Sequence, residues 1–214
     1  TSGDENTAMG RVALEKLTTG SFNNAFGSQS LDANTTGSNN IGIGYQALSA
    51  NTTADSNTGI GHQALKLNTT GDLNVAVGAL ALDANTVGDR SVAMGYSALG
   101  SQNPASNADM NNTAVGYAAG NSITTGIKNT LIGSVAGDAI TTADNNVAVG
   151  MSALGATTTG ADNTAVGSGA LDANTTASSN TAVGKDALGA NTTGANNAAL
   201  GKNALISNTT GGFN

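Results

Sequence analysis

The sequence predicts an all-β protein, a parallel β-solenoid or β-roll of about twelve coils. An apolar residue followed by Gly recurs at an interval of seventeen positions ten times and at an interval of twenty-one once. The same residue types recur at most other positions of the unit, and a unit this short cannot hold two ordinary helices and their turns. The recurring glycines are Gly10, Gly27, Gly44, Gly61, Gly78, Gly95, Gly116, Gly133, Gly150, Gly167, Gly184 and Gly201.

The average unit reads N-T-A-V-G-Y-x-A-L-x-A-N-T-T-G-x-x, and we number its positions one to seventeen from the Asn. Position one is Asn in eleven of twelve coils, with Ser91 as the exception. Position three is Ala in nine coils, position four is always a sizeable apolar residue, and position eight is Ala in eleven. Position nine is Leu in ten coils and is replaced by Gly120 and Gly137 in the others.

Three segments of the unit have different local preferences. Positions two to four are rich in Thr, Val and Ile and predict a short strand. The segment after the Gly, such as Tyr45 to Ala50, fits a second short strand or a single helical turn, and we favour the strand. The NTTG segment predicts a turn, because Asn and Gly tolerate positive φ and Asn and Thr side chains bond their own backbone.

Stacking of identical positions supplies the core that one coil lacks. We expect position four and the Leu of position nine to form a continuous apolar column, with backbone hydrogen bonds between coils about 4.8 Å apart. The Asn column at position one predicts a ladder of side-chain amides, which satisfies buried polar groups. Position three and the Gly of position five then face outward. So small an outer face predicts an elongated homotrimer, and a monomer with a flat face of small residues is the alternative.

The repeat array covers residues 1–214 as one domain, with an inserted bulge at about residues 101–111. The insertion contains the only proline, Pro104, which prevents a regular coil. We expect this segment to leave the stack and to decorate its surface.

Composition excludes several classes of function. The chain has 7 basic and 14 acidic residues, a net charge of −7, and no clustered basic face that could bind nucleic acid. No apolar run approaches the roughly 18 residues needed to insert into a membrane. With one His and no Cys, no catalytic triad, metal site or cofactor site is expected, so the protein is not predicted to be an enzyme. Matches to G-x-G-x-x-A at Gly42 and Gly59 are the ordinary repeat rather than a nucleotide site.

Other recurring residues have a structural interpretation. Asp55, Asp72 and Asp89 repeat at position sixteen, where we expect solvated surface rather than bound Ca²⁺. Six NTT triplets match the glycosylation acceptor pattern, but they coincide with the repeat turn. Candidates for surface binding are the aromatic residues of variable position six and the insertion proline. These candidates are Tyr45, His62, Tyr96, Tyr117 and Pro104.

Units such as NTAVGYAAG at 112–120, NNVAVGMSAL at 145–154 and NTAVGKDAL at 180–188 resemble known repeats. They are similar to the YadA-like head repeats of trimeric autotransporter adhesins and to NTAVG-type shafts of phage tail fibres. The resemblance spans all twelve coils and implies a left-handed β-roll, a homotrimer, and a location outside the cell, on its surface or on a virion. The repeat unit is longer than expected for adhesin heads, and its NTTG turn is unusual there.

The sequence therefore predicts a non-enzymatic structural rod segment of an extracellular attachment fibre or adhesin. The expected partners are further copies of the chain and a glycan or protein on a host surface. The alternative is a repetitive-surface binder, such as an ice-binding or glycan-binding solenoid. The Thr columns at positions thirteen and fourteen motivate the ice-binding version, although adjacent Thr residues in a strand point to opposite faces.

Overall fold

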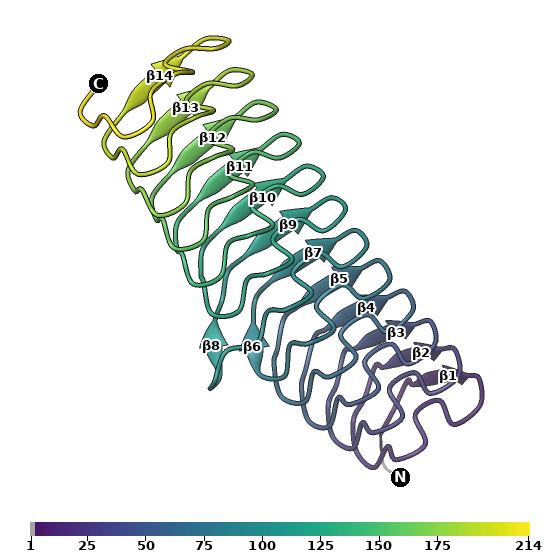
Figure 1. Cartoon of the computed structure of the whole chain (residues 1–214). Coiled ribbons are helices and arrows are strands. Elements are labelled where there is room, and N and C mark those ends of the chain that lie inside the picture. Colours follow the sequence, from purple (N-terminus) through teal and green to yellow (C-terminus); the bar gives the residue numbers. More distant parts are fainter. Residues whose placement is uncertain (1–2) are drawn as a thin grey trace. The chain divides into compact units, whose positions relative to one another are not determined.

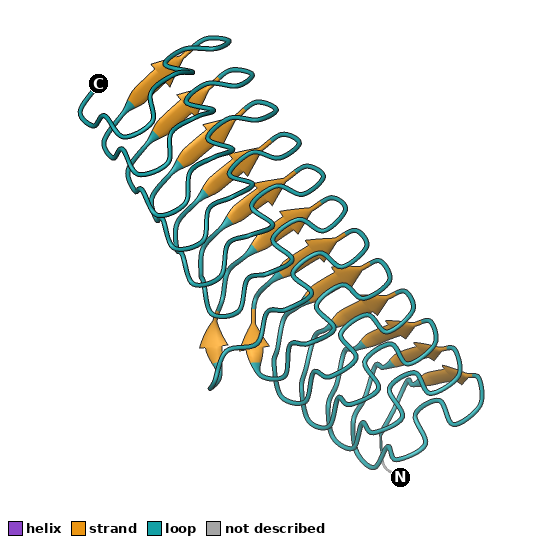
Figure 2. Cartoon of the chain, viewed as in Figure 1, coloured by secondary structure: helices purple, strands orange, loops and turns teal. Residues whose placement is uncertain are grey.

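The computed structural model describes residues 3–214, and these contain short strands, turns and bends but no helix. Successive strands pair in parallel to form a β-solenoid, which confirms the predicted fold class (Figures 1 and 2). The chain divides into two compact units, which end and begin at Asn111 and Asn112. This division falls directly after the predicted insertion, and each unit is described by itself.

The first unit stacks six coils, each with one three-residue strand. Residues of equal position lie opposite each other, as in the pairing of Ala76 with Ala93. Two further strands of two residues each, β6 (Gly88–Asp89) and β8 (Ala108–Asp109), also pair in parallel. The six main strands are β1 (Thr7–Met9), β2 (Asn24–Phe26), β3 (Ile41–Ile43), β4 (Thr58–Ile60), β5 (Val75–Val77) and β7 (Val92–Met94).

The second unit repeats this arrangement with six further coils, again paired in parallel and in register. Position two pairs with position two and position four with position four, so the predicted stacking of equal positions is confirmed. The strands are β9 (Thr113–Val115), β10 (Thr130–Ile132), β11 (Val147–Val149), β12 (Thr164–Val166), β13 (Thr181–Val183) and β14 (Ala198–Leu200).

The side chains that the strands direct into the core are the opposite of those predicted. Position three is buried in every coil from Ala25 to Ala199, whereas position four is half-buried or exposed in every coil, as in Met94 at 43%. The expectation that position four fills the interior is therefore wrong, and so is the small outer face inferred from it. The physical reason is the thinness of the coil: a Cβ at Gly59 would already lie 3.1 Å from Leu48 Cγ and 3.2 Å from the Ala64 carbonyl oxygen.

The Leu column at position nine forms the core, as predicted. Leu48, Leu65 and Leu82 are fully buried, and the alanines of position eight pack beside them. Where Gly137 replaces this Leu, Leu131 at position three and Ile140 at position twelve fill the space. A Cβ at Gly137 would lie 2.8 Å from one Leu131 methyl and 2.9 Å from the Ile140 methyl. Core volume is thus conserved within one coil even though its residues are exchanged.

The segment after the invariant Gly is a series of turns, so the favoured second strand is wrong. Positions seven and nine both have left-handed backbone, as in Gln46 (φ 54°) and Leu48 (φ 54°). Backbone bonds close short turns from the Ala47 amide to the Gly44 carbonyl and from the Asn51 amide to the Leu48 carbonyl. Two left-handed residues only two positions apart are incompatible with a continuous strand.

The invariant Gly of position five has a steric cause. Gly150 has φ 136°, and a Cβ there would lie 2.6 Å from the carbonyl carbon of Gly167 in the next coil. Backbones of neighbouring coils thus approach too closely for any side chain, in a conformation that L-residues rarely adopt.

Two buried ladders of amide side chains run along the coils. At position one, Asn57 Oδ1 accepts from the Asn74 backbone amide at 2.9 Å, and Asn57 Nδ2 donates to the Gly71 carbonyl at 2.8 Å. This ladder was predicted. The ladder at position twelve was not: Asn68 Nδ2 donates to Asn51 Oδ1 at 3.2 Å and to the same Gly71 carbonyl at 2.9 Å.

Candidate functional site

The described part of the chain, residues 3–214, forms no pocket, and no three of its His, Asp or Glu side chains come together as a metal site. Among these residues there is also no helix that could cross a membrane. Candidate sites are therefore sought on the outer surfaces of the coils.

The outer sheet face consists of the side chains at positions two and four. It contains no charged residue in any of the twelve coils. In the first unit it combines side chains such as Ile41, Ile43, Val75 and Val77, and all are half-buried or exposed. In the second unit, Thr at position two often accompanies Val at position four, as in Thr164 and Val166. Each unit thus presents a flat, uncharged, largely aliphatic surface.

The aromatic residues of position six lie on the surface, as expected. Tyr45 is 45% exposed and stacks on His62 with ring centroids 5.5 Å apart and an interplanar angle of 27°. Tyr96 is also exposed in the first unit, and Tyr117 is exposed in the second. Pro104 is buried instead, so this candidate does not present a binding surface.

A third ladder of amide side chains lies at position seven, directly after the aromatic residues of position six in the sequence. This ladder was not predicted from the sequence. Gln46 Nε2 donates to Gln29 Oε1 at 3.2 Å, and Gln63 Nε2 donates to Gln46 Oε1 at 2.9 Å. The run of Gln at one position in three successive coils was the available signal. Its meaning was hidden because position seven varies strongly elsewhere in the array.

The acidic column at position sixteen has a structural role. The Asp55 amide donates to Asp72 Oδ1 at 2.7 Å, and the Asp72 amide donates to Asp89 Oδ1 at 2.7 Å. Ser38 takes the same role, accepting from the Ser21 amide at 3.1 Å. A side-chain acceptor thus satisfies a backbone amide of the preceding coil, which explains why Asp and Ser exchange there.

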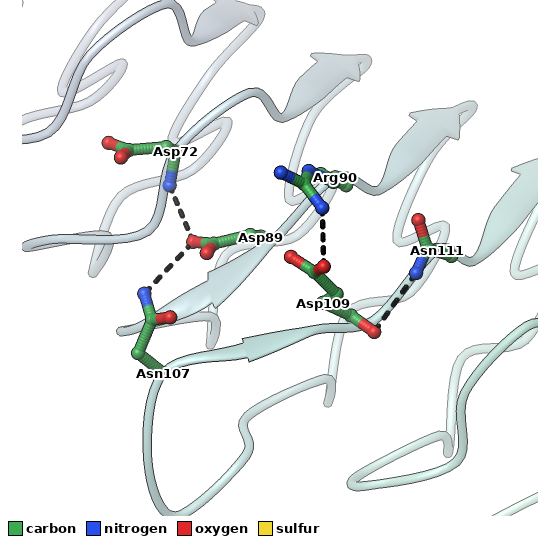
Figure 3. A network of polar contacts seen from close by, with 6 residues as sticks. All are labelled: Asp72, Asp89, Arg90, Asn107, Asp109 and Asn111. Carbon is green, nitrogen blue, oxygen red and sulfur yellow. Dashed lines mark hydrogen bonds and ion pairs between the residues drawn. The ribbon is translucent and has the colours of Figure 1, made fainter.

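The insertion is tied to this column and is only partly extruded. Asn107 Nδ2 donates to Asp89 Oδ1 at 3.2 Å, and Asp109 forms an ion pair with Arg90 (Figure 3). Residues 105–107 are exposed, as the predicted bulge requires, but Met110 is fully buried. A Cβ at Gly88 would lie 3.0 Å from Met110, so part of the insertion covers the coil before it.

Four Asp carboxyl groups at position ten have raised pKa values. Burial raises the pKa of the Asp172 carboxyl above its ordinary value, and the charge of nearby Asp186 raises it further. Burial is also the main cause of the raised pKa values of Asp32, Asp83 and Asp138. Asp32, Asp83, Asp138 and Asp172 stand in coils that are not adjacent, so no two of them are direct neighbours in the position-ten column.

The Thr and Asn residues of the repeat turn are largely committed to structure. Thr hydroxyls at position thirteen donate to the next coil, as that of Thr52 does to the Thr69 carbonyl at 3.2 Å. The Asn residues of the NTT triplets from Asn34 to Asn191 are fully buried. A buried amide engaged in a ladder cannot accept a glycan, so these triplets are turn elements.

Comparison of the chain with protein-family models, with characterised proteins and with solved structures gives no match. The structure itself defines the class of protein, a parallel β-solenoid whose outer surfaces differ along the array.

Proposed function

We propose that the chain is a non-enzymatic rod segment of an extracellular attachment fibre or adhesin and that it acts as a homotrimer. The observation that carries the proposal is the uncharged outer sheet face, which is left without a covering layer in each unit. Exposed, continuous aliphatic surface is rare on monomers and typical of association sites.

The repeat favours a further copy of the same chain as the partner on this face. Side chains at position four recur once per coil, about every 4.8 Å. A partner with the same period keeps every contact in register along the stack, whereas an unrelated surface drifts out of register after a few coils. The outer sheet face therefore supports self-association for a reason opposite to that given by the sequence, since bulky rather than small residues face the partner.

The experiment places a charge on the outer sheet face without touching the core. Val149→Asp combined with Val166→Asp introduces two carboxylates that a partner would have to desolvate. We expect native mass spectrometry to give three chains for the unaltered protein and one chain for the variant, with circular dichroism unchanged.

The matched control is Ser178→Asp, at position sixteen of the same unit, where other coils already carry Asp. This control should leave the number of chains in the assembly unchanged. An unaltered protein that is monomeric at micromolar concentration, or a double variant that still assembles, would refute the proposal.

A further inference from the structure

Positions six and seven of the first unit carry side chains that the fold does not require. Coils of the second unit have Ser134, Met151 or Ser168 at position six and form the same strands and turns. The coil therefore does not need the stacked Tyr45 and His62 in order to fold. It does not need the Gln ladder either, since Ser152 stands at position seven of a regular coil. Chemistry that is concentrated in one part of a uniform array indicates a binding role.

Ala79 follows His62 along the position-six column, and Tyr96 follows Ala79. The Leu80 amide donates to the His62 carbonyl at 3.0 Å, and the Ser97 amide donates to the Ala79 carbonyl at 3.0 Å, which fixes this order in space. With about 4.8 Å per coil, two ring-bearing residues stand roughly 10 Å apart with a methyl side chain between them. Because Ala79 is short, the interval between the exposed side chains of His62 and Tyr96 is wide enough for a six-membered sugar ring.

Positions six and seven of the five coils from Ser28 to Ser97 form one edge of the coils, and the groups there that suit a ligand are aromatic rings, amides and hydroxyl groups. No Asp, Glu, Lys or Arg occurs at positions six and seven of the five coils from Ser28 to Ser97. Ring faces suit the C–H face of a sugar, and amides can donate to and accept from its hydroxyl groups. Because the described surface has no pocket, an extended polymer suits it better than a small molecule.

We propose that this edge binds a neutral glycan chain lying along the coils, with one pyranose ring above Ala79 between His62 and Tyr96. The Gln63 amide, at the end of the ladder, hydrogen-bonds to the hydroxyl groups of that sugar. The neutral glycan is the class of receptor that the proposed attachment fibre would recognise, so its biological role rests on the proposed function. Chain association is measured separately, so either idea can fail without the other.

The test is binding of the full chain to a printed array of neutral and acidic oligosaccharides. Ala79→Tyr places a ring between His62 and Tyr96, at a position where other coils already carry Tyr. We expect the unaltered chain to bind neutral glycans and Ala79→Tyr to weaken that binding by roughly tenfold or more. Gln63→Ser, which copies position seven of the coil at Ser97, should also weaken it.

Met151→Tyr is the matched control, because it adds a ring at position six of the second unit. It should leave glycan binding unchanged. Light scattering and circular dichroism of every variant establish that assembly and fold are retained. The proposal is overturned if the unaltered chain binds no neutral glycan on the array, binds only acidic ones, or binds as well after Ala79→Tyr.

Discussion

Buried Asn residues hold each coil to the next by joining side chains to backbone groups that would otherwise be unpaired. The exception shows how closely the two ladders are linked. In the coil where Ser91 replaces Asn at position one, the longer Gln102 replaces Asn at position twelve. The Ser91 hydroxyl then lies 3.1 Å from Gln102 Nε2 and 3.2 Å from Oε1. The paired exchange restores hydrogen bonds that either change alone would lose.

This linkage predicts coupling between two substitutions. Asn57→Ser removes the acceptor of the buried Asn74 amide, which should lower the free energy of unfolding by about 1–3 kcal/mol. Adding Asn68→Gln copies the Ser91 and Gln102 pair within another coil and should recover part of that loss. Urea denaturation of the single and double variants measures the coupling. Strictly additive losses would show that the pairing in the natural coil is coincidental.

The acid at position ten predicts a pH-dependent gain in stability. The pKa of the Asp172 carboxyl is raised in the folded chain, so the folded state binds its proton more tightly than the unfolded state does. Above the pKa of the folded state, the charged carboxylate therefore lowers the free energy of unfolding. This loss disappears below the pKa of the unfolded state. Asp172→Asn should raise the thermal midpoint at pH 7 and have little effect near pH 3.

Asp162→Asn provides the comparison, because Asp162 is a carboxylate at position seventeen of the preceding coil and does not belong to the acids of position ten. A shift of the midpoint at pH 3 as large as that at pH 7 for Asp172→Asn would contradict the assigned cause.

At the level of the element, the turn after each strand depends on one glycine. Gly150→Ala combines an unfavourable φ with a Cβ 2.6 Å from the Gly167 carbonyl carbon. Such backbone strain alone costs about 1–3 kcal/mol, and the clash adds to it. Gly201→Ala separates the two effects, because Gly201 has φ 119° but no atom within 4 Å of a Cβ. Thermal denaturation should show a larger loss for Gly150→Ala, and equal losses would show that close approach contributes nothing.

The strands, their register and one Asn ladder followed from periodicity, because identical residues at equal spacing can only stack on one another. The orientation of the strands did not, because alternation alone defines two faces without saying which one is inside. Leu48 and Ala64 leave room for little more than a methyl group at Gly59, and this volume could be judged only with the turns in place. The turns after the invariant Gly were not predicted, because the Leu of position nine is not a residue that normally indicates left-handed backbone.

The candidate surface was predictable in part. Tyr45 and His62 were found because position six varies whereas the Gly before it does not, and the expected surface exposure holds for both. Pro104 was misassigned, because its place in an insertion indicated exposure whereas its ring packs near Gly88. The ring-to-ring stacking and the Gln ladder depend on side-chain direction, which the sequence alone does not contain.

At the scale of the whole molecule, the hydrogen bonds between coils that the described residues form within each unit join a coil to the coil directly before or after it. Stability in such an array is close to a sum of coil and interface contributions. The ladder at position one repeats once per coil in the second unit, as in the Asn180 amide that donates to Asn163 Oδ1 at 3.0 Å. A whole coil can therefore be removed while this ladder and the pairing of equal positions are kept across the new junction.

Deletion of residues 164–180 removes one complete repeat and joins Asn163 to Thr181, so that Asn again precedes a strand. We expect the shortened chain to keep its β circular dichroism and a cooperative transition at a moderately lower temperature. Deletion of residues 164–179 leaves Asn180 as an extra residue and moves the next coil one step out of register, which turns its outer side chains inward. This variant should lose much more stability, since Thr181 would replace Ala182 in a space that holds little more than a methyl group, and Val183 would stand in place of the invariant Gly184. Equal thermal midpoints for the two deletions would mean that stacking of equal positions is not what stabilises the array.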